Sequence, residues 1–221
     1  MIAKISPSVM CVDFMELRSV LSDMEQNGIE YIHVDIMDGV FVPNYTLGTD
    51  FIKQLKNATN IPLDIHLMIT EPEKKLEWFT FGEGDYVSVH LESTKDPHGA
   101  LAQIRARGAK AMLAISPDTP AESVWEYIDE IDAVLVMTVY PGFAGQKLIP
   151  ETLEKVRLLR QELDRRGYDK IELEVDGNVS FANAPRMREA GADIFVAGTS
   201  SVFTKEMPFA AAVQQLRDLI K

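Results

Sequence analysis

The segment Tyr31-Ile32-His33-Val34-Asp35-Ile36-Met37 alternates apolar with polar side chains, the pattern of a β-strand whose two faces meet different surroundings. Ile32, Val34 and Ile36 suit a layer of packed helices. His33, Asp35 and Met37 then point to the opposite face. In a closed α/β barrel these faces are the helix-facing exterior and the packed interior, so the alternation predicts that a histidine and an aspartate point into a barrel.

Strand-like runs of this kind recur along the whole chain and alternate with amphipathic stretches that carry helix signals. Sharing the 221 residues among eight such units gives about 28 residues each, close to the 30 or so of one strand–helix–strand repeat. The expected fold class is therefore α/β, a single (β/α)8 TIM barrel. The expected strands are Lys4–Met10, Tyr31–Met37, Pro62–Met68, Tyr86–Leu91, Ala111–Ser116, Ala133–Thr138, Ile171–Asp176 and Asp193–Gly198.

Capping residues mark the expected helices. Asp13 followed by Glu16 predicts a capping box at the start of the first helix, Gly28 predicts its end, and a second helix is expected over 50–58. Later helical stretches are expected to open at Pro72, Pro120 and Pro150 and to end at Gly82, Gly108, Gly167 and Gly191. No Ser/Gly-rich linker divides the chain, so residues 1–221 are expected to form one domain.

A doubly wound open sheet is the alternative architecture. A dinucleotide-binding sheet would carry a G-x-G-x-x-G turn after its first strand, whereas the segment Ser6-Pro7-Ser8-Val9-Met10-Cys11 contains no glycine. The closed barrel is therefore favoured.

Composition narrows the classes of function. With 34 acidic and 22 basic residues the net charge is −12, which repels polyphosphates and anionic lipids, so we expect no nucleic acid and no membrane partner. The single Cys11 cannot form an internal disulfide, and neither an apolar signal region nor a run of about 20 apolar residues is present. We expect a cytoplasmic protein.

Three of the expected strands direct polar side chains inward with the same phase. Beside His33 and Asp35, the inward positions are Asp64, His66 and Met68 in the third strand and Glu172, Glu174 and Asp176 in the seventh. Buried carboxylates are costly unless they are paired, protonated or bound to a metal, and these strands offer no interior lysine or arginine. His33, Asp35, His66 and Asp176 are therefore predicted to bind one divalent cation, such as Zn²⁺, Fe²⁺, Mn²⁺ or Co²⁺, at the C-terminal mouth of the barrel.

Other residues near the expected mouth have less specific patterns. His90 and Glu92 end the fourth strand, and we interpret them as structural or as support for the metal site, without a defined role. Met37, Met68 and Met137 suit either core packing or an apolar wall beside the metal.

Glycine-containing loops follow the sixth, seventh and eighth expected strands. Glycines allow backbone N–H groups to surround an anion, and the loops after strands 7 and 8 commonly bind phosphate in such barrels. Together the loops predict a phosphate ester as part of the substrate. The expected binding residues are Gly142, Phe143, Ala144 and Gly145 in the first loop, Gly177 and Asn178 in the second, and Gly198, Thr199 and Ser200 in the third.

Several segments together resemble the ribulose-phosphate 3-epimerase family. HVDIMDGVFVPN (residues 33–44) is similar to one family signature and DIHLM (64–68) to another, and the likeness spans essentially the whole chain, from SPS (6–8) through MTV (137–139), PGF (141–143) and EVDG (174–177) to GTS (198–200). The resemblance implies a ribulose-phosphate-binding barrel and an isomerase that requires one divalent metal ion per subunit, Zn, Fe, Mn, Co or Mg. It also implies that Asp35 and Asp176 are the bases and that Ser8 and His66 contact substrate.

The substrate motifs depart from those of typical ribulose-phosphate enzymes, which usually read N-P-G-F-G-G-Q, D-G-G and G-S-A. This chain has Tyr140 before the Pro-Gly-Phe segment, then Ala144, Asn178 and Thr199-Ser200. Ala144 and the Gly-Thr-Ser segment look more like the D-allulose-6-phosphate 3-epimerase branch, whereas Tyr140 fits neither pattern. Both D-allulose 6-phosphate and D-ribulose 5-phosphate therefore stay open as substrates.

Inverting a carbon next to a ketone requires proton removal on one face and proton return on the other, so two acid/base groups must flank it. Asp35 and Asp176 are expected to do this through a metal-stabilised enediolate. The alternatives are an aldolase- or decarboxylase-type lyase and a non-catalytic sugar-phosphate binder. Against the lyase, Tyr31–Ile52 contains no lysine or arginine; against the binder, all four ligands are present. The resemblance also implies a homo-oligomer, either a dimer or a hexamer.

Overall fold

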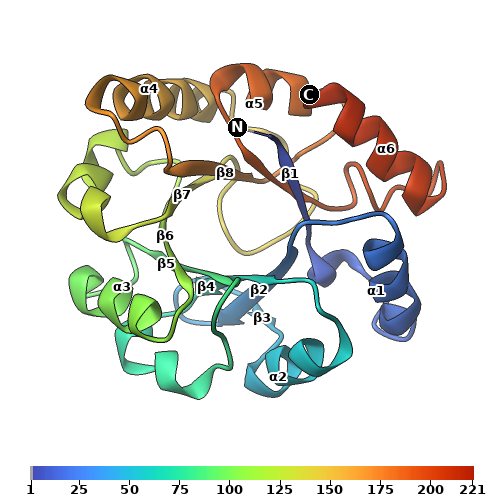
Figure 1. The fold of residues 1–221 in the computed structure, drawn as a ribbon, viewed down its shortest axis with the longest axis horizontal. Coiled ribbons are helices and arrows are strands. Elements are labelled where there is room, and N and C mark those ends of the chain that lie inside the picture. The colour runs from blue at the N-terminus through green and yellow to red at the C-terminus, as the bar shows by residue number, and fades with distance from the viewer. Residues whose placement is uncertain (1) are drawn as a thin grey trace.

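The computed structural model describes residues 2–221 and shows a ring of strands surrounded by helices (Figure 1). Eight strands are mutually parallel and follow the order β1-β9-β8-β7-β6-β5-β4-β2 around the sheet. A parallel bridge between Ser8 and His33 joins the end of β1 to β2 and closes the ring. The strands are β1 (Lys4–Pro7), β2 (Ile32–Asp38), β4 (Leu63–Met68), β5 (Tyr86–His90), β6 (Lys110–Ile115), β7 (Ala133–Met137), β8 (Glu172–Asp176) and β9 (Ile194–Ala197).

The predicted (β/α)8 barrel is thus confirmed, with all eight strands close to their expected positions. A ninth strand, β3 (Tyr45–Thr46), was not expected and pairs antiparallel with the end of β2. The first strand ends at Pro7 rather than Met10, because the chain turns into a short 3₁₀ helix over Val9–Cys11.

The outer layer consists of six α-helices and several 3₁₀ segments. The α-helices are α1 (Leu17–Gln26), α2 (Thr49–Ala58), α3 (Pro97–Ala106), α4 (Glu151–Arg166), α5 (Ala184–Ala190) and α6 (Phe209–Leu219). The 3₁₀ helices in the outer layer are Pro72–Lys74, Leu76–Trp78 and Ala121–Glu130. None of the helices in residues 2–221 is long and apolar enough to cross a membrane.

Three of the helix-start predictions were wrong in detail. Asp13 does not cap a helix with Glu16: its carboxylate accepts a bond from the Met15 N–H at 3.0 Å, and α1 begins only at Leu17. Pro72 and Pro120 open 3₁₀ rather than α-helical segments. The segment after Pro120 ends in Asp129 and Glu130, and negative charge at the C-terminal end is unfavourable for a regular α-helix.

The predicted two-faced strands are confirmed by the packing. Ile32, Val34, Ile65 and Leu67 are fully buried in the core between the sheet and the helices. His33 and the other inward side chains occupy the barrel interior instead, so the sheet separates an apolar layer from a polar one.

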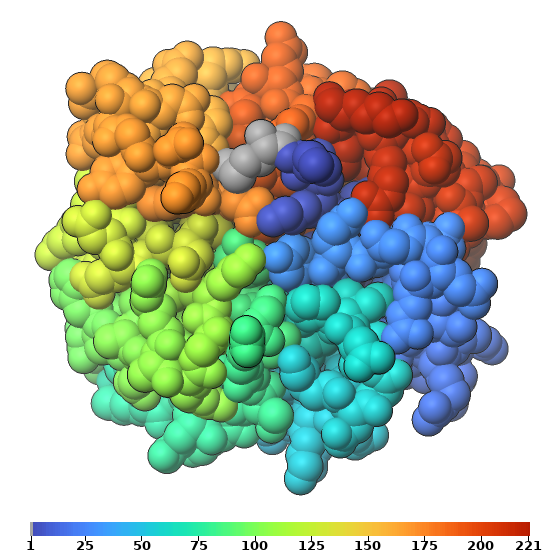
Figure 2. All heavy atoms as spheres, in the orientation of Figure 1, coloured from blue at the N-terminus to red at the C-terminus, as the bar shows by residue number. Residues whose placement is uncertain are grey.

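The N-terminal end of the barrel is filled by a charged cluster. Lys4 Nζ lies 2.6 Å from Glu172 Oε1, the Tyr86 hydroxyl donates to Glu172 Oε2 at 2.7 Å, and Lys110 Nζ lies 4.7 Å from the centre of the Tyr86 ring. Figure 2 shows this face, with the dark-blue start of the described chain near its centre. Lys4 of β1 therefore neutralises Glu172. Nearer the C-terminal end, the ion pairs of Asp35 and Asp176 within residues 2–221 involve histidines and no lysine.

Candidate metal centre and substrate pocket

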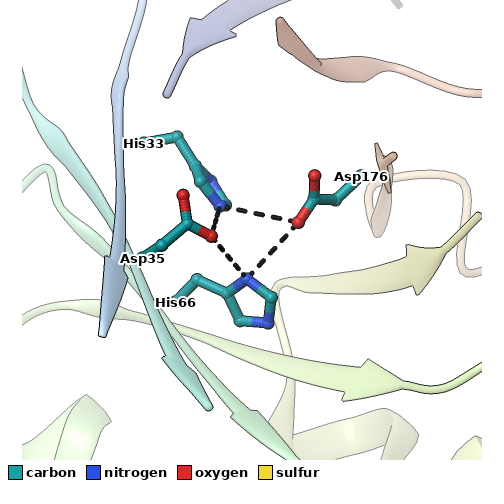
Figure 3. Close-up of side chains that lie close together, drawn as sticks. All are labelled: His33, Asp35, His66 and Asp176. Atoms are coloured by element: carbon teal, nitrogen blue, oxygen red, sulfur yellow. Dashed lines mark ion pairs between the residues drawn. The ribbon is translucent and has the colours of Figure 1, made fainter. Parts of the chain in front are cut away.

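Four predicted ligands converge at the C-terminal end of the barrel. Figure 3 shows His33 and Asp35 from β2, His66 from β4 and Asp176 from the end of β8 directed at a common point. His33 Nε2 lies 3.3 Å from Asp35 Oδ1 and 3.7 Å from Asp176 Oδ2. His66 Nδ1 lies 3.6 Å and 3.5 Å from the same two oxygens. One atom from each residue thus lies within 4.8 Å of the others.

This geometry fits a single divalent cation. Nitrogen and oxygen ligands at about 2.0–2.2 Å from a tetrahedral ion lie about 3.3–3.6 Å from one another, close to the separations between these four side chains. His33 Nε2 and His66 Nδ1 are buried and have no hydrogen-bond partner among the described residues. Two unsatisfied imidazole nitrogens facing two carboxylate oxygens form a donor set that a cation satisfies.

The other side of His33 is held by a second carboxylate. His33 Nδ1 lies 2.6 Å from Asp64 Oδ2, and the Ser6 hydroxyl donates to the same oxygen at 2.9 Å. The carboxylate of Glu174 lies 3.6 Å from His33 Nδ1. The sequence identified Asp64 and Glu174 as inward-facing but assigned them no role, and the contribution of Ser6 was missed because serine carries no distinctive pattern.

Burial and charge both shift the pKa values of these groups, in opposite directions for His33 and Asp35. Desolvation lowers the pKa of His33, but the carboxylates of Asp64 and Asp35 outweigh it and raise that pKa well above its ordinary value. For Asp35 desolvation raises the pKa, and the positive charge of His33 reverses the effect and lowers it. Burial, followed by the charge of Asp64, raises the pKa of Glu174. In the metal-free protein a proton on His33 therefore balances the neighbouring carboxylates.

A pocket of about 590 Å³, including its open mouth, lies over the four side chains. Every predicted substrate residue lines this pocket except His66. His66 belongs to the cluster with Asp35 and Asp176, which do line the pocket, and so lies at its base. The predicted residues in the lining are Ser8, Gly142, Phe143, Ala144, Gly145, Asp176, Gly177, Asn178, Gly198, Thr199 and Ser200.

The loops at the mouth are fixed to one another by side-chain amides. The Asn178 amide donates to the Gln146 carbonyl at 2.8 Å, and the Asn44 amide donates to the Gly142 carbonyl at 2.8 Å. Gly177 has φ +121°, and a Cβ there would lie 2.6 Å from Val139 Cγ2. The sequence located these loops, but the roles of Asn44 and Gln146 as links between them could only come from the structure.

Three buried methionines border the pocket. Met37, Met68 and Met137 are at most 4% exposed and line the pocket beside Asp35 and Asp176. The Ser8 hydroxyl donates to Asp35 Oδ2 at 2.5 Å, so it orients that carboxylate as well as lining the pocket. Cys11 lies in the same lining and was not predicted to do so.

Tyr140, His90 and Glu92 had no assigned role. Tyr140 lines the pocket mouth and its hydroxyl contacts both carboxylate oxygens of Asp118, at 3.0 and 3.1 Å. His90 lies beside His66, and the two Nε2 atoms are 2.8 Å apart. Glu92 contacts His90 Nδ1 through Oε2 at 3.0 Å.

Comparison with known proteins identifies the family. The model of the ribulose-phosphate 3 epimerase family matches residues 4–203. The ribulose-phosphate 3-epimerase of Bacillus subtilis (strain 168) is 39% identical over 197 residues, which cover 89% of this chain and 91% of that protein. The enzyme of the same name from Synechocystis sp. is 43% identical over 201 residues, covering 90% of this chain and 86% of that one.

Among solved structures, a 3-hexulose-6-phosphate synthase superposes with a TM-score of 0.69 at 17% identity, with complete coverage of both chains. At that identity the likeness shows the shared barrel alone. The family match covers 200 positions and the relatives are named as epimerases, which favours an epimerase over the lyase and the non-catalytic binder. The chain therefore belongs to the ribulose-phosphate 3-epimerase family, whose members are isomerases.

Proposed function

We propose that this protein inverts carbon 3 of a ketose phosphate with Asp35 and Asp176 as its two acid/base groups and one divalent metal ion held by His33, Asp35, His66 and Asp176. The observation that carries the proposal is the convergence of two unpartnered imidazole nitrogens and two carboxylates at the base of the pocket. A cation bound there would polarise the ketone oxygen and so make the neighbouring carbon–hydrogen bond more acidic.

The two carboxylates are suitably arranged for proton exchange on opposite faces. Asp35 comes from β2 and Asp176 from β8, on different sides of the cluster (Figure 3). One aspartate removes the proton from carbon 3, leaving an enediolate, and the other delivers a proton to the opposite face. Running the reaction in reverse exchanges the two roles.

The rest of the pocket holds the substrate in place and limits water. The glycine loops at residues 142–145, 177–178 and 198–200 are proposed to bind the phosphate through backbone N–H groups. Met37, Met68 and Met137 cover the reacting end with apolar surface, which strengthens the electrostatic interactions there. Ser8 orients Asp35 by donating to its Oδ2.

Two substrates have separate support. The curated relatives are named for ribulose phosphate, which favours D-ribulose 5-phosphate and its epimer D-xylulose 5-phosphate. Ala144 and the segment Gly198-Thr199-Ser200 resemble the branch that acts on D-allulose 6-phosphate, with D-fructose 6-phosphate as product. The cytoplasmic location and the homo-oligomeric state stay predictions.

The test begins with protein stripped of metal by a chelator and reloaded separately with Zn²⁺, Fe²⁺, Mn²⁺, Co²⁺ or Mg²⁺. Epimerisation of both sugar phosphates should be lost on stripping and restored by at least one ion, and the ratio of kcat/KM values identifies the substrate. His33→Ala should lose metal binding, whereas the matched surface variant His98→Ala should bind normally. Full epimerase activity in verified metal-free protein would contradict the proposal.

A further inference from the structure

A chain of hydrogen bonds runs from His66 away from the proposed metal. His66 Nε2 lies 2.8 Å from His90 Nε2, and His90 Nδ1 lies 3.0 Å from Glu92 Oε2. Both histidines are completely buried. Neither His90 nor Glu92 lines the substrate pocket of the described chain, and their hydrogen-bonded link to the four-residue cluster runs through His66.

The direction of each bond follows from the chemistry of imidazole. A neutral imidazole carries one N–H and one lone pair, so of two nitrogens 2.8 Å apart one must donate and the other accept. If His66 binds a cation through Nδ1, its proton lies on Nε2, and His66 is the donor. His90 Nε2 must then accept, which leaves the proton of His90 on Nδ1, where it points at Glu92.

Glu92 is itself held in position. Its Oε1 accepts a bond from the Ser116 N–H at 2.7 Å and another from the Thr119 hydroxyl. The Phe41 ring lies 4.9 Å from the His90 ring and covers it. The acceptor at the end of the chain is therefore fixed before any ligand binds, and it aligns both histidines.

We infer that His90 and Glu92 are a positioning pair that holds His66 as the Nε2–H tautomer, with its Nδ1 lone pair directed at the divalent cation. This inference rests on the proposed metal site. The other histidine ligand is oriented differently, because His33 Nδ1 contacts the carboxylate of Asp64 directly at 2.6 Å. His66, which faces the site through Nδ1, contacts an intervening imidazole instead, and loss of that imidazole leaves its Nε2 without a buried acceptor.

The first test needs no substitution. Long-range ¹H–¹⁵N correlation spectra of the uniformly labelled, Zn²⁺-loaded protein report which nitrogen of each histidine carries the proton. We expect His66 protonated on Nε2 and His90 on Nδ1. A proton on His90 Nε2 in the loaded protein would overturn the inference, because that nitrogen could no longer accept from His66.

The second test measures metal affinity directly. The Kd for Co²⁺, obtained by competition with a chromophoric chelator, should rise about 10- to 100-fold in His90→Phe, the usual effect of losing a group that orients a metal ligand. His90→Gln, whose amide oxygen can accept from His66, should recover part of the affinity, and Glu92→Gln should weaken binding less than His90→Phe. His98→Ala, at an exposed histidine, is the matched control.

Urea unfolding of the metal-free variants shows whether each is folded. A folded His90→Phe with the wild-type Kd would refute the positioning role while leaving the metal site intact. If His33→Ala instead binds Co²⁺ with the wild-type Kd, the proposed metal site is refuted, and the inference with it. The two failures therefore have different signatures.

Discussion

Replacing one acid/base aspartate at a time should separate proton exchange from inversion. Asp35→Asn and Asp176→Asn are isosteric changes that keep an oxygen able to face the histidine nitrogens. In Asp35→Asn the new amide NH₂ can donate to the Ser8 hydroxyl, which already lies 2.5 Å from Oδ2, so the fold should be retained. Each variant loses one base and keeps the other.

The size of the effect follows from the lack of a substitute base. General acid/base catalysis contributes about 10²- to 10⁴-fold, or roughly 3–5 kcal/mol of activation free energy. Cys11 also lines the pocket, but desolvation by burial raises its pKa, so its thiol stays protonated and cannot replace an aspartate. We therefore expect epimerisation to fall by about 10²- to 10⁴-fold in either variant.

The assay is mass spectrometry of each purified epimer incubated in D₂O. The remaining aspartate can still remove the carbon-3 proton of one epimer and return deuterium to the same face. Asp35→Asn should therefore exchange one epimer without inverting it, and Asp176→Asn should exchange the other. Near-normal epimerisation in either variant, or exchange of the same epimer by both, would refute the two-base reasoning.

Three further substitutions test the surroundings of the site. Desolvation raises the pKa of Asp38, but the N–H groups of Thr70, Phe41 and Val40 and the Lys75 ammonium outweigh it and lower the pKa from 3.8 to about 2. The ionised Asp38 carboxylate stabilises the fold above its unfolded-state pKa, and this stabilisation is lost as the pH falls through its folded-state pKa. Asp38→Ala should therefore lower the free energy of unfolding by about 2 kcal/mol at pH 7 and by progressively less below pH 4, measured by urea unfolding. Tyr86→Phe should lower the free energy of unfolding by roughly 1.5–3 kcal/mol, because Glu172 loses a buried donor, and an unchanged urea midpoint would contradict this. Gly177→Ala should lower the free energy of unfolding by about 1–3 kcal/mol through backbone strain. The new Cβ would also meet Val139, so KM should rise, and steady-state kinetics with the wild-type KM would exclude a tight turn there.

The face of the sheet that each strand side chain takes was predictable, because it depends only on the alternation of apolar and polar residues. Ile32 and Val34 face the helices and His33 and Asp35 the interior, as a period of two requires. The helical layer was less predictable. Residues 121–130 carry the apolar spacing of an α-helix yet form a 3₁₀ helix, since local hydrogen bonding and end charges decide between the two and spacing does not.

The convergence of the four candidate ligands was predictable from the sequence, whereas the residues that support them were not. His66 and Asp176 reach the mouth because of strand phase and strand-end position, both readable in the sequence. Ser6 reaches Asp64 across 58 positions, and such a contact depends on the register between β1, β2 and β4. The assignment of residues 1–221 to one domain and the roles of the site residues stay predictions.

The negative charge of the carboxylates inside the barrel is offset in a different way at each height along the barrel axis. Near the N-terminal end Lys4 neutralises Glu172. In the middle, the carboxylates of Asp64 and Asp35 raise the pKa of His33, and burial raises the pKa of Glu174.

At the C-terminal mouth, Asp35 and Asp176 have no lysine or arginine beside them, since none lines the pocket among residues 2–221. A lysine there would pair with the carboxylates and exclude a cation, whereas a divalent ion would cancel the two carboxylate charges and keep open positions for substrate oxygens. The overall charge of −12 makes that local neutralisation important, because the field of the whole molecule repels a phosphorylated substrate.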